Sequence, residues 1–442
     1  MITPTTNTAG TAARPAHPAR FAALRREARF VARERAVWAW WAVVLLLAAL
    51  AVGSGLHEVA QQRATIARLI EADRLDRSAA QQPLKDWGSA AYHGFHFTHD
   101  PPSDFAFAAL GRRDDTAWKH RIRMLALEGQ IHERDAGHPV LALTGRFDFA
   151  FLAAFVLPLV LIVLLHDLRA GERQAGRHEL LVATAGHPAA LWRWRAGLRA
   201  AGVFVAAALP LAVGAALAGT ALPTLGAALA ALAAYLAGWT LLAAALAAWR
   251  RPGELILAAL LALWLLLAVL LPAAGRGAID RALPLPAGAD ILLTQREAVN
   301  DAWDLPKAET MAAFVERHPE WAPHAAVQRP FEWKWYYAFQ QVGDQRAEAL
   351  SSAYTAGRLR RERWAARAAW LAPPVLLERQ LQHLARTDLA ATLAYEARVR
   401  AFHAELRAFY YPRLFRDEPF DPAALAGLPR FEPRAGAGYL VP

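Results

Sequence analysis

The feature that most constrains this chain is an apolar stretch over residues 147–274, which is broken only where Arg, Pro and Gly cluster. A bilayer hydrocarbon core about 30 Å thick requires roughly 20 apolar residues in a helix. Five runs approach that length: residues 38–55, 149–165, 200–219, 225–248 and 255–271. A soluble helix needs a polar face, and these runs are apolar all round. The sequence therefore predicts membrane-spanning helices rather than a large soluble helical core.

The predicted fold class is an all-α integral membrane protein with five transmembrane helices and a large, mainly helical periplasmic ectodomain in two insertions. The spans are assigned to residues 37–56, 147–166, 196–220, 223–249 and 254–274. The tail 1–36 and the segment 167–195 are then expected in the cytoplasm. Ectodomain parts 57–146 and 275–442 are expected in the periplasm, with the chain in a bacterial inner membrane.

Charge supports this orientation. The formal net charge is +10, and the basic excess is concentrated beside the spans, in the tail and in residues 167–195. Basic residues beside spans mark the cytoplasmic side of a membrane protein, so no nucleic-acid partner is expected. The chain has no cysteine, which excludes disulfides and thiolate metal sites.

The N-terminal region suggests contact with the membrane surface. Residues 1–18 are rich in Thr, Ala and Pro, a composition typical of disorder. Residues 20–35 carry apolar positions at helical spacing among arginines. This pattern predicts an amphipathic helix on the inner membrane face, with a solvated juxtamembrane helix as the alternative. Trp38, Trp40 and Trp41 follow where an interfacial aromatic belt belongs; a cleaved signal peptide is the other interpretation of this region.

The two ectodomain parts carry mostly helical patterns. Helices are expected over residues 59–80, 116–134, 305–317, 333–367 and 375–411, the last with a break near Thr387 and Asp388. Residues 87–97 are aromatic and punctuated by glycine, and they are expected to form an ordered loop or short strands. The aromatic cluster at residues 331–337 is expected to be a packed core helix, with a ligand site or a membrane-interface patch as the alternatives.

No motif of enzyme chemistry stands out. The chain lacks a P-loop lysine pattern, a Gly-x-Ser-x-Gly elbow and a His-Glu-x-x-His helix. His93, His96 and His99 are weak metal candidates because they are spaced by three, but histidines in an aromatic loop more often pack and hydrogen-bond. The predicted spans carry no ionisable residue at mid-depth, which disfavours an ion-coupled carrier. No cofactor is expected in this chain.

Four stretches give the chain a family resemblance. Trp87, Tyr92, His93 and Gly94 lie in a segment that continues to Pro101-Pro102-Ser103, and a second segment runs from Gly145 to Leu159. The third, residues 171–181, and the fourth, residues 373–388 with Phe420 and 428–432, complete the set. The chain resembles ABC-2 type permeases of the DUF3526 subgroup, relatives of the NosY-like permeases. Tyr92 and His93 stand in swapped order, and Arg177 stands where the subgroup has Thr.

The resemblance implies a membrane-spanning permease subunit of an ATP-binding cassette transporter, an exporter. It implies partners as well: separate ABC ATPase subunits that hold ATP and Mg²⁺, and a second permease copy or paralogue within the lipid bilayer. The segment 172–187 is expected to contain the coupling helix that docks on the ATPase. The residues expected to carry that role are Glu172, Arg173, Gly176, Glu179, Leu180 and Leu181.

Alternatives to a permease remain at this point. The ectodomain of a membrane-anchored periplasmic enzyme or assembly factor could do the work, or the chain could be a sensor or scaffold. The resembled family normally has a sixth span after a Leu-Pro-x-Phe segment, and only about a dozen residues follow Phe431 here. We therefore expect either that a final span follows residue 442 or that this member lacks it.

Overall fold

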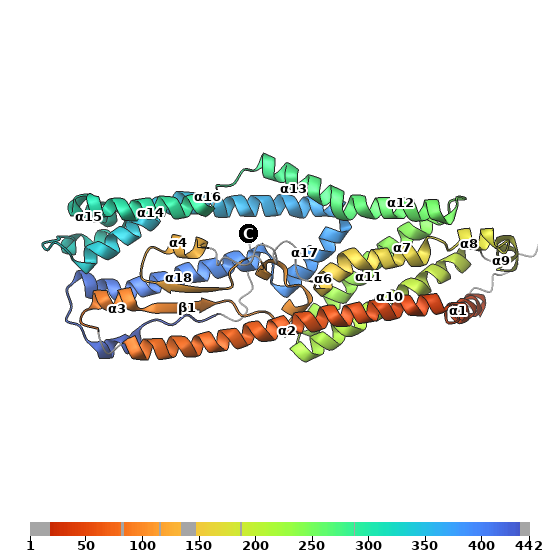
Figure 1. Cartoon of the computed structure of the whole chain (residues 1–442), viewed down its shortest axis with the longest axis horizontal. Helices are drawn as coiled ribbons and strands as arrows, with labels where there is room; N and C mark the ends of the chain where they lie inside the picture. Colours follow the sequence, from red (N-terminus) through yellow and green to blue (C-terminus); the bar gives the residue numbers. More distant parts are fainter. Residues whose placement is uncertain are drawn as a thin grey trace, which may run out of the picture. The chain divides into compact units, whose positions relative to one another are not determined.

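The computed structural model describes residues 18–80, 84–114, 116–133, 147–185, 188–286 and 288–433. Within these ranges the chain is helical apart from one two-stranded sheet, as expected for the predicted class (Figure 1). The described chain divides into two compact units. Residues 1–17 and the last residues of the chain lie outside the description, and so do Gly145 of the resemblance and His187 of the expected coupling segment.

The first unit comprises Met1–Ala48, Phe155–Pro210 and Leu229–Leu266. It contains α1 (Pro18–Val31), the start of α2 (Arg35–Ala80), α7 (Leu157–Leu165), α8 (Ala170–Gln174), α9 (His178–Thr184), most of α10 (Pro188–Ala218) and of α11 (Leu222–Leu246), and α12 (Gly253–Leu265). Its helices pack closely at a glycine: a Cβ on Gly202 would lie 1.9 Å from the Trp41 ring. The indole of Trp41 donates to the Arg199 carbonyl at 3.1 Å, which joins α2 to α10.

A second tryptophan contact explains a local irregularity. The helix before α7 widens into the π-helical turn η3 (Leu152–Val156), where the hydrogen-bond ladder of the backbone is disturbed. The Trp264 indole of α12 donates to the Phe155 carbonyl at 3.1 Å. Trp264 therefore binds a carbonyl of this turn and holds α12 against the beginning of α7.

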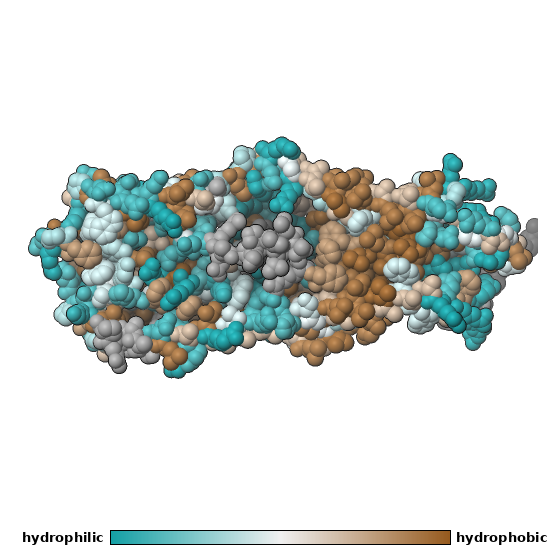
Figure 2. All heavy atoms as spheres, viewed as in Figure 1, coloured by the Kyte–Doolittle hydropathy of each residue, from teal (hydrophilic) through white to brown (hydrophobic). Residues whose placement is uncertain are grey.

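Five helices of the described chain are long and apolar enough to cross a membrane: Arg35–Asp76, Phe149–Gln174, Ala189–Ala218, Leu222–Leu246 and Gly253–Ala282. This confirms the number of candidate spans predicted from the sequence. Apolar side chains gather on the surface of these helices (Figure 2). The helix Phe149–Gln174 buries 67% of its most apolar window, whereas the others bury 17–33%. It is therefore the candidate span most enclosed by protein.

The second unit comprises Ala49–Ala154, Leu211–Ala228 and Leu267–Pro442. After the rest of α2 it contains α3 (Trp87–His93), β1 (Phe95–His99), η1 (Ala106–Ala108), η2 (Gly111–Asp114), β2 (Lys119–Arg123), α4 (Leu127–His132) and α6 (Phe149–Phe151). From residue 267 on come η4 (Leu266–Leu270), α13 (Leu271–Ala282), α14 (Gly288–Asp304), α15 (Lys307–Arg317), η5 (Pro319–His324), α16 (Trp333–Ala368), η6 (Ala369–Leu371), α17 (Pro373–Ala385), α18 (Leu389–Phe415) and η7 (Pro422–Gly427).

The prediction of one helix over residues 116–134 is wrong. Residues 119–123 form strand β2, which pairs antiparallel with β1 in the register Phe95 to Arg123 and His99 to Lys119. The reason is tertiary: Ile122 is buried in the core of the second unit, and it lies opposite His96 of β1, a pairing with another segment that the local pattern does not contain. Residues 87–97 were expected to form an ordered loop or short strands. The strand is present as β1, but residues 87–93 before it form helix α3.

The long C-terminal helical region breaks where the sequence predicted. Residues 375–411 belong to two helices, α17 and α18, and Arg386 between them has φ of +54°. The Asp388 side chain then caps α18 by accepting from the Ala391 N–H at 3.1 Å. The helix expected over residues 305–317 begins after Pro306, and the preceding helix α14 was not foreseen.

The core of the second unit is aromatic. Its fully buried side chains come from α15, α16 and α18 and include Phe314, Tyr337, Phe339, Tyr410 and Phe415. Helix α3 packs on the same core through Trp87, Ala90 and Ala91, and strand β2 does so through Ile122. The expected core role of the cluster at residues 331–337 holds for Trp335 and Tyr337, which are buried, whereas Phe331 stays largely exposed.

Candidate functional site

The segment between α7 and α10, called here the connector (residues 166–187), holds every predicted coupling residue. It folds as two short helices, α8 and α9, with a turn at Gly176 whose φ of +71° favours glycine. The structure begins α10 at Pro188, so the helix extends well before residue 196, where the third span was expected to start. Residues 188–195 of the predicted segment 167–195 are therefore helical and continuous with α10.

A buried arginine fixes the base of the connector. The Arg195 guanidinium donates from Nη1 to Oε1 of Glu172 and from Nε to Oε2 of Glu27, both at 2.7 Å. The side chain of Arg195 is only 4% exposed, and its guanidinium carbon lies 4.2 Å from the centre of the Phe30 ring. A buried guanidinium with two carboxylates is held strongly because either charge alone would be unsolvated. Arg195 thereby links α1, α8 and α10.

Further contacts extend this ion cluster. Glu172 also accepts from Nε of Arg177 at 2.9 Å, just before α9. Arg199 donates to both oxygens of Glu34, at 2.7 and 2.9 Å, and to the Leu164 carbonyl at the end of α7. The connector is thus tied by charge to α1 and α10 through Glu172, while Arg199 joins α10 to Glu34, just before α2, and to the end of α7.

The connector also contacts the turn between α11 and α12. Nη2 of Arg173 donates to the carbonyls of Trp249 and Arg251, at 2.9 and 3.2 Å. Asp167 lies where a Cβ on Gly171 or Gly253 would clash, at 2.5 and 2.9 Å from its carboxylate oxygens. Glycine at both positions leaves room for this carboxylate without a shift of the Asp167 side chain.

Helix α9 is exposed, in contrast to the buried ion cluster at the base of the connector. None of its residues is buried, and Leu180 is 67% exposed. On its other side the ring of His178 stacks on Trp192, with centroids 5.5 Å apart and an interplanar angle of 13°. The structure therefore presents Leu180 and Glu179 outward and keeps Leu181 and Val182 half-buried.

The predicted coupling residues therefore have two structural roles. Glu172 and Arg173 are occupied by contacts within the chain, so they position the connector. Glu179 and Leu180 are exposed, and Gly176 shapes the turn between the helices. Sequence reasoning missed Glu27 and Arg195 as members of this site. One signal could have found them: a lone acidic residue in a basic helix, and an arginine set among Trp192, Trp194 and apolar residues.

The ectodomain motif residues are placed differently. Trp87 is buried and its indole donates to the Pro419 carbonyl at 3.1 Å. Gly94 ends α3 with its N–H bound to the Ala90 carbonyl, and Tyr92 lies under the Arg123 guanidinium at 5.7 Å. His93 is exposed at the end of α3. These side chains hold α3 against the rest of the second unit.

The three weak metal candidates do not come together. His96 is fully buried beside Phe402, and His99 is buried beside Phe431. Burial lowers the pKa of His99, which favours its neutral form. Within the described residues, no group of three or more His, Cys, Asp or Glu side chains is placed to hold a metal ion.

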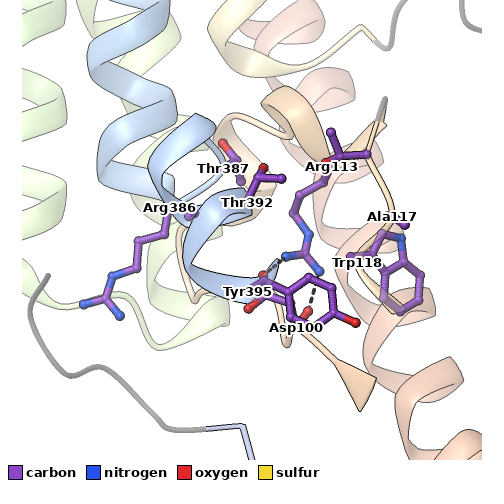
Figure 3. A pocket seen from close by; sticks show the side chains of 10 residues that line it. Asp100, Arg113, Ala117, Trp118, Arg386, Thr387, Thr392 and Tyr395 are labelled. Carbon is purple, nitrogen blue, oxygen red and sulfur yellow. Dashed lines mark hydrogen bonds and ion pairs between the residues drawn. The ribbon is translucent and has the colours of Figure 1, made fainter. Parts of the chain in front are cut away.

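A small polar hollow lies near β1 and the start of α18 (Figure 3). Asp100 accepts from Nη1 of Arg113 at 2.8 Å, and the Tyr395 hydroxyl is 2.9 Å from the Thr98 hydroxyl. The cavity volume of about 10 Å³ is at the lower limit of the space that one water molecule needs. This size and the internal ion pairing make the hollow part of the packed core, and a substrate would not fit it.

Comparison with known proteins covers one part of the chain. No curated protein and no solved structure matches it. Residues 290–434, which run from α14 through α18 and η7, match the family model of a domain of unknown function, DUF3526, so this part of the chain carries that domain.

Proposed function

We propose that this chain is the membrane-spanning permease subunit of an ATP-binding cassette transporter, an exporter, driven by a separate ATPase subunit. The observation that carries the proposal is α9: a short helix with no buried residue and an outward leucine, held at its base by a buried ion cluster. A helix fixed in place yet uncovered on its apolar side suits a partner that binds there. The DUF3526 match over residues 290–434 agrees with the resemblance to ABC-2 type permeases.

The mechanism follows from this division of roles. Work from ATP hydrolysis on the partner would enter at Leu180, which would insert into an apolar groove. The ion cluster of Glu27, Glu172 and Arg195 would pass movement of α9 to α1 and α10, because buried ion pairs resist separation. The chain itself needs no nucleotide, and the ATP and Mg²⁺ would belong to the partner. A second permease copy or paralogue would complete the assembly in the bacterial inner membrane.

The experiment compares Leu180→Asp with a matched control, Gln174→Asp, which places the same charge on the exposed surface of α8. Burial of one leucine contributes about 1.5–3 kcal/mol, which corresponds to roughly 10–150-fold in affinity. We expect Leu180→Asp to lose co-purification with the ATPase subunit and stimulation of its activity, whereas Gln174→Asp retains both. Full binding and stimulation by a normally inserted Leu180→Asp variant would reject α9 as the coupling element.

A further inference from the structure

The C-terminal third of α16 and the 3-10 turn η6 that follows it carry an exposed face that the transport proposal does not use. Arg360, Arg363, Trp364, Arg367 and Trp370 follow one another at helical spacings of one, three and four residues, so they lie on one side of the helix. Trp364 is 53% exposed and Trp370 73%, and the adjoining Leu371 is 66% exposed. Large apolar side chains gathered on one exposed face usually mark a contact surface.

The opposite side of the same helix is fully engaged. Arg358 pairs with Glu396 at 2.8 Å, Arg361 with Asp280 at 2.9 Å, and Glu362 with Arg379 at 2.8 Å. By contrast, Arg360, Arg363 and Arg367 have no ion pair within the described part of the chain; the guanidinium of Arg367 instead lies 5.4 Å from the Trp364 ring. The exposed face therefore offers three positive charges beside two indoles.

Helix α13 shows where the exposed face of α16 lies relative to the end of a candidate span. The two helices run antiparallel, since Gly357 packs against Leu285 and Arg361 binds Asp280 (Figure 1). The nine residues from Arg361 to Trp370 span about 14 Å at 1.5 Å per residue. The same distance along α13 leads from Asp280 to Leu271, where the apolar run of the candidate span ends.

A second contact also places the exposed face near the end of a candidate span. Helix α17, which begins at Pro373 just after Leu371, packs on α6 (Phe149–Phe151). Helix α6 opens another candidate span, Phe149–Gln174. The exposed end of α16 thus lies near α6 and Leu271, the parts of two candidate spans that belong to the second unit.

We propose that this face rests on the lipid headgroup layer, with Trp370 and Leu371 at the acyl boundary and the three arginines on the phosphates of anionic phospholipids. Tryptophan concentrates at membrane interfaces, because its ring is apolar and its N–H needs a polar partner. Clustered arginines beside a span attract anionic lipids. The proposal requires that the candidate spans cross a bilayer, but it is independent of transport.

The charge of the exposed face favours lipid, rather than a second copy of the chain, as its partner. A symmetric contact between two such faces would bring six arginines together in a poorly solvated interface, and like charges at that range repel. An anionic headgroup layer neutralises the same charges while accepting the indoles. The exposed face therefore complements lipid better than it complements itself.

The test uses single cysteines, because the chain has none of its own. Leu371→Cys and Ser352→Cys each receive a polarity-sensitive fluorophore; Ser352 lies on the same exposed side of α16, about 28 Å along the helix. The full chain is reconstituted in phosphatidylcholine vesicles with 30% phosphatidylglycerol and nitroxide lipids labelled below the headgroup. We expect quenching at position 371 to exceed that at position 352 by about threefold or more.

A label on Leu241→Cys, an exposed position of α11, serves as the reference for insertion. Equal weak quenching at positions 371 and 352, with strong quenching at 241, would overturn the lipid contact and leave the spans intact. Absence of quenching at 241 would overturn the insertion on which the proposal rests. A spontaneous 371–371 disulfide between copies would assign the face to self-association instead.

The charge requirement is tested separately. The triple variant Arg360→Gln, Arg363→Gln, Arg367→Gln should lose the extra quenching that phosphatidylglycerol gives over phosphatidylcholine alone. The control removes the same charge from three exposed arginines elsewhere in the second unit: Arg329, Arg416 and Arg430. Loss of the lipid effect in both triples would contradict a specific role for the exposed face of α16.

Discussion

The candidate spans and the globular part of the second unit (residues 84–133 and 288–433) place their large apolar side chains in opposite ways. Along the spans, leucines such as Leu217 and Leu241 point outward and are largely exposed. In the globular part, Phe314, Tyr337 and Phe339 are almost completely enclosed. Apolar residues exposed over several turns are stable only in an apolar medium. The difference is compatible with a chain that has both membrane and aqueous parts.

Both regions nevertheless bury charge. In the first unit, Glu27, Glu172 and Arg195 form one ion cluster. In the second, Arg400 binds Glu128 through two bonds at 2.7 and 2.9 Å, and Ser351 donates to the same carboxylate. Burial by itself would raise the pKa of Glu128, but the bonds from Arg400, His132 and Ser351 outweigh it and hold the pKa well below its usual range.

The largest effect is expected from Arg195→Leu. The substitution removes the buried cation that Glu27 and Glu172 share and leaves them only the more exposed Arg26 and Arg177; breaking a buried pair typically costs about 3–5 kcal/mol. Hydrogen exchange of the α8 and α9 amides should accelerate strongly. The matched control is Arg193→Leu, which removes an exposed arginine two residues away whose Nε donates to the Ala189 carbonyl at 3.2 Å. Equal acceleration in both variants would mean that the ion cluster does not hold the connector.

Asp344→Ala should weaken the globular part by about 3 kcal/mol. Its carboxylate accepts from the N–H groups of Leu127 and Glu128 at the start of α4 and from Arg407 at 2.6 Å. The variant leaves these donors unmatched. Asp301→Ala removes an exposed partner of Arg346 and should cost under about 1 kcal/mol. The comparison is made by chemical unfolding monitored in the near-ultraviolet; similar midpoints for the two variants would refute the difference.

Glu378→Gln tests a pH dependence confined to the second unit. Burial and the nearby Asp148 raise the pKa of Glu378 from 4.5 to about 7, against the attraction of Arg379. The folded chain therefore keeps a proton that the unfolded chain loses between pH 4.5 and 7, so stability falls across this window as pH rises. The upper limit of the loss is about 3 kcal/mol.

Glu378→Gln should therefore raise the unfolding temperature at pH 8 more than at pH 4. The control Glu405→Gln alters an exposed carboxylate on α18 and should show no such difference. A wild-type chain whose stability is flat between pH 4.5 and 7 would argue against the raised pKa.

The smallest effect on stability is expected from Leu180→Ser. The side chain is mostly exposed and packs little, so unfolding should change by less than about 0.5 kcal/mol. The two variants then separate the positioning of the connector from its contact with a partner. Arg195→Leu should disorder the connector, whereas Leu180→Ser should leave it ordered. A large loss of stability in Leu180→Ser would show that α9 packs inside the chain rather than facing a partner.

Much of the fold could be predicted because its signals are local. The five apolar runs, the long helix α16 and the break near Thr387 each depend on a few neighbouring residues. Strand β2 could not be predicted in this way, because residues 119–123 become a strand only when β1 pairs with them. The expected coupling residues were found by resemblance, yet Glu27 of the same site lies 145 residues before Glu172.

The sequence by itself determined which segments are apolar over a membrane's thickness, where helices break and which reactions lack their motifs, because composition and spacing carry that information. Tertiary structure alone decided which charges are buried together and which side chains are left uncovered. Arg195 and Arg363 are alike in sequence terms, but one is enclosed by two carboxylates and the other is exposed beside Trp364. Burial depends on the partners that the fold brings from distant segments, and no local pattern encodes it.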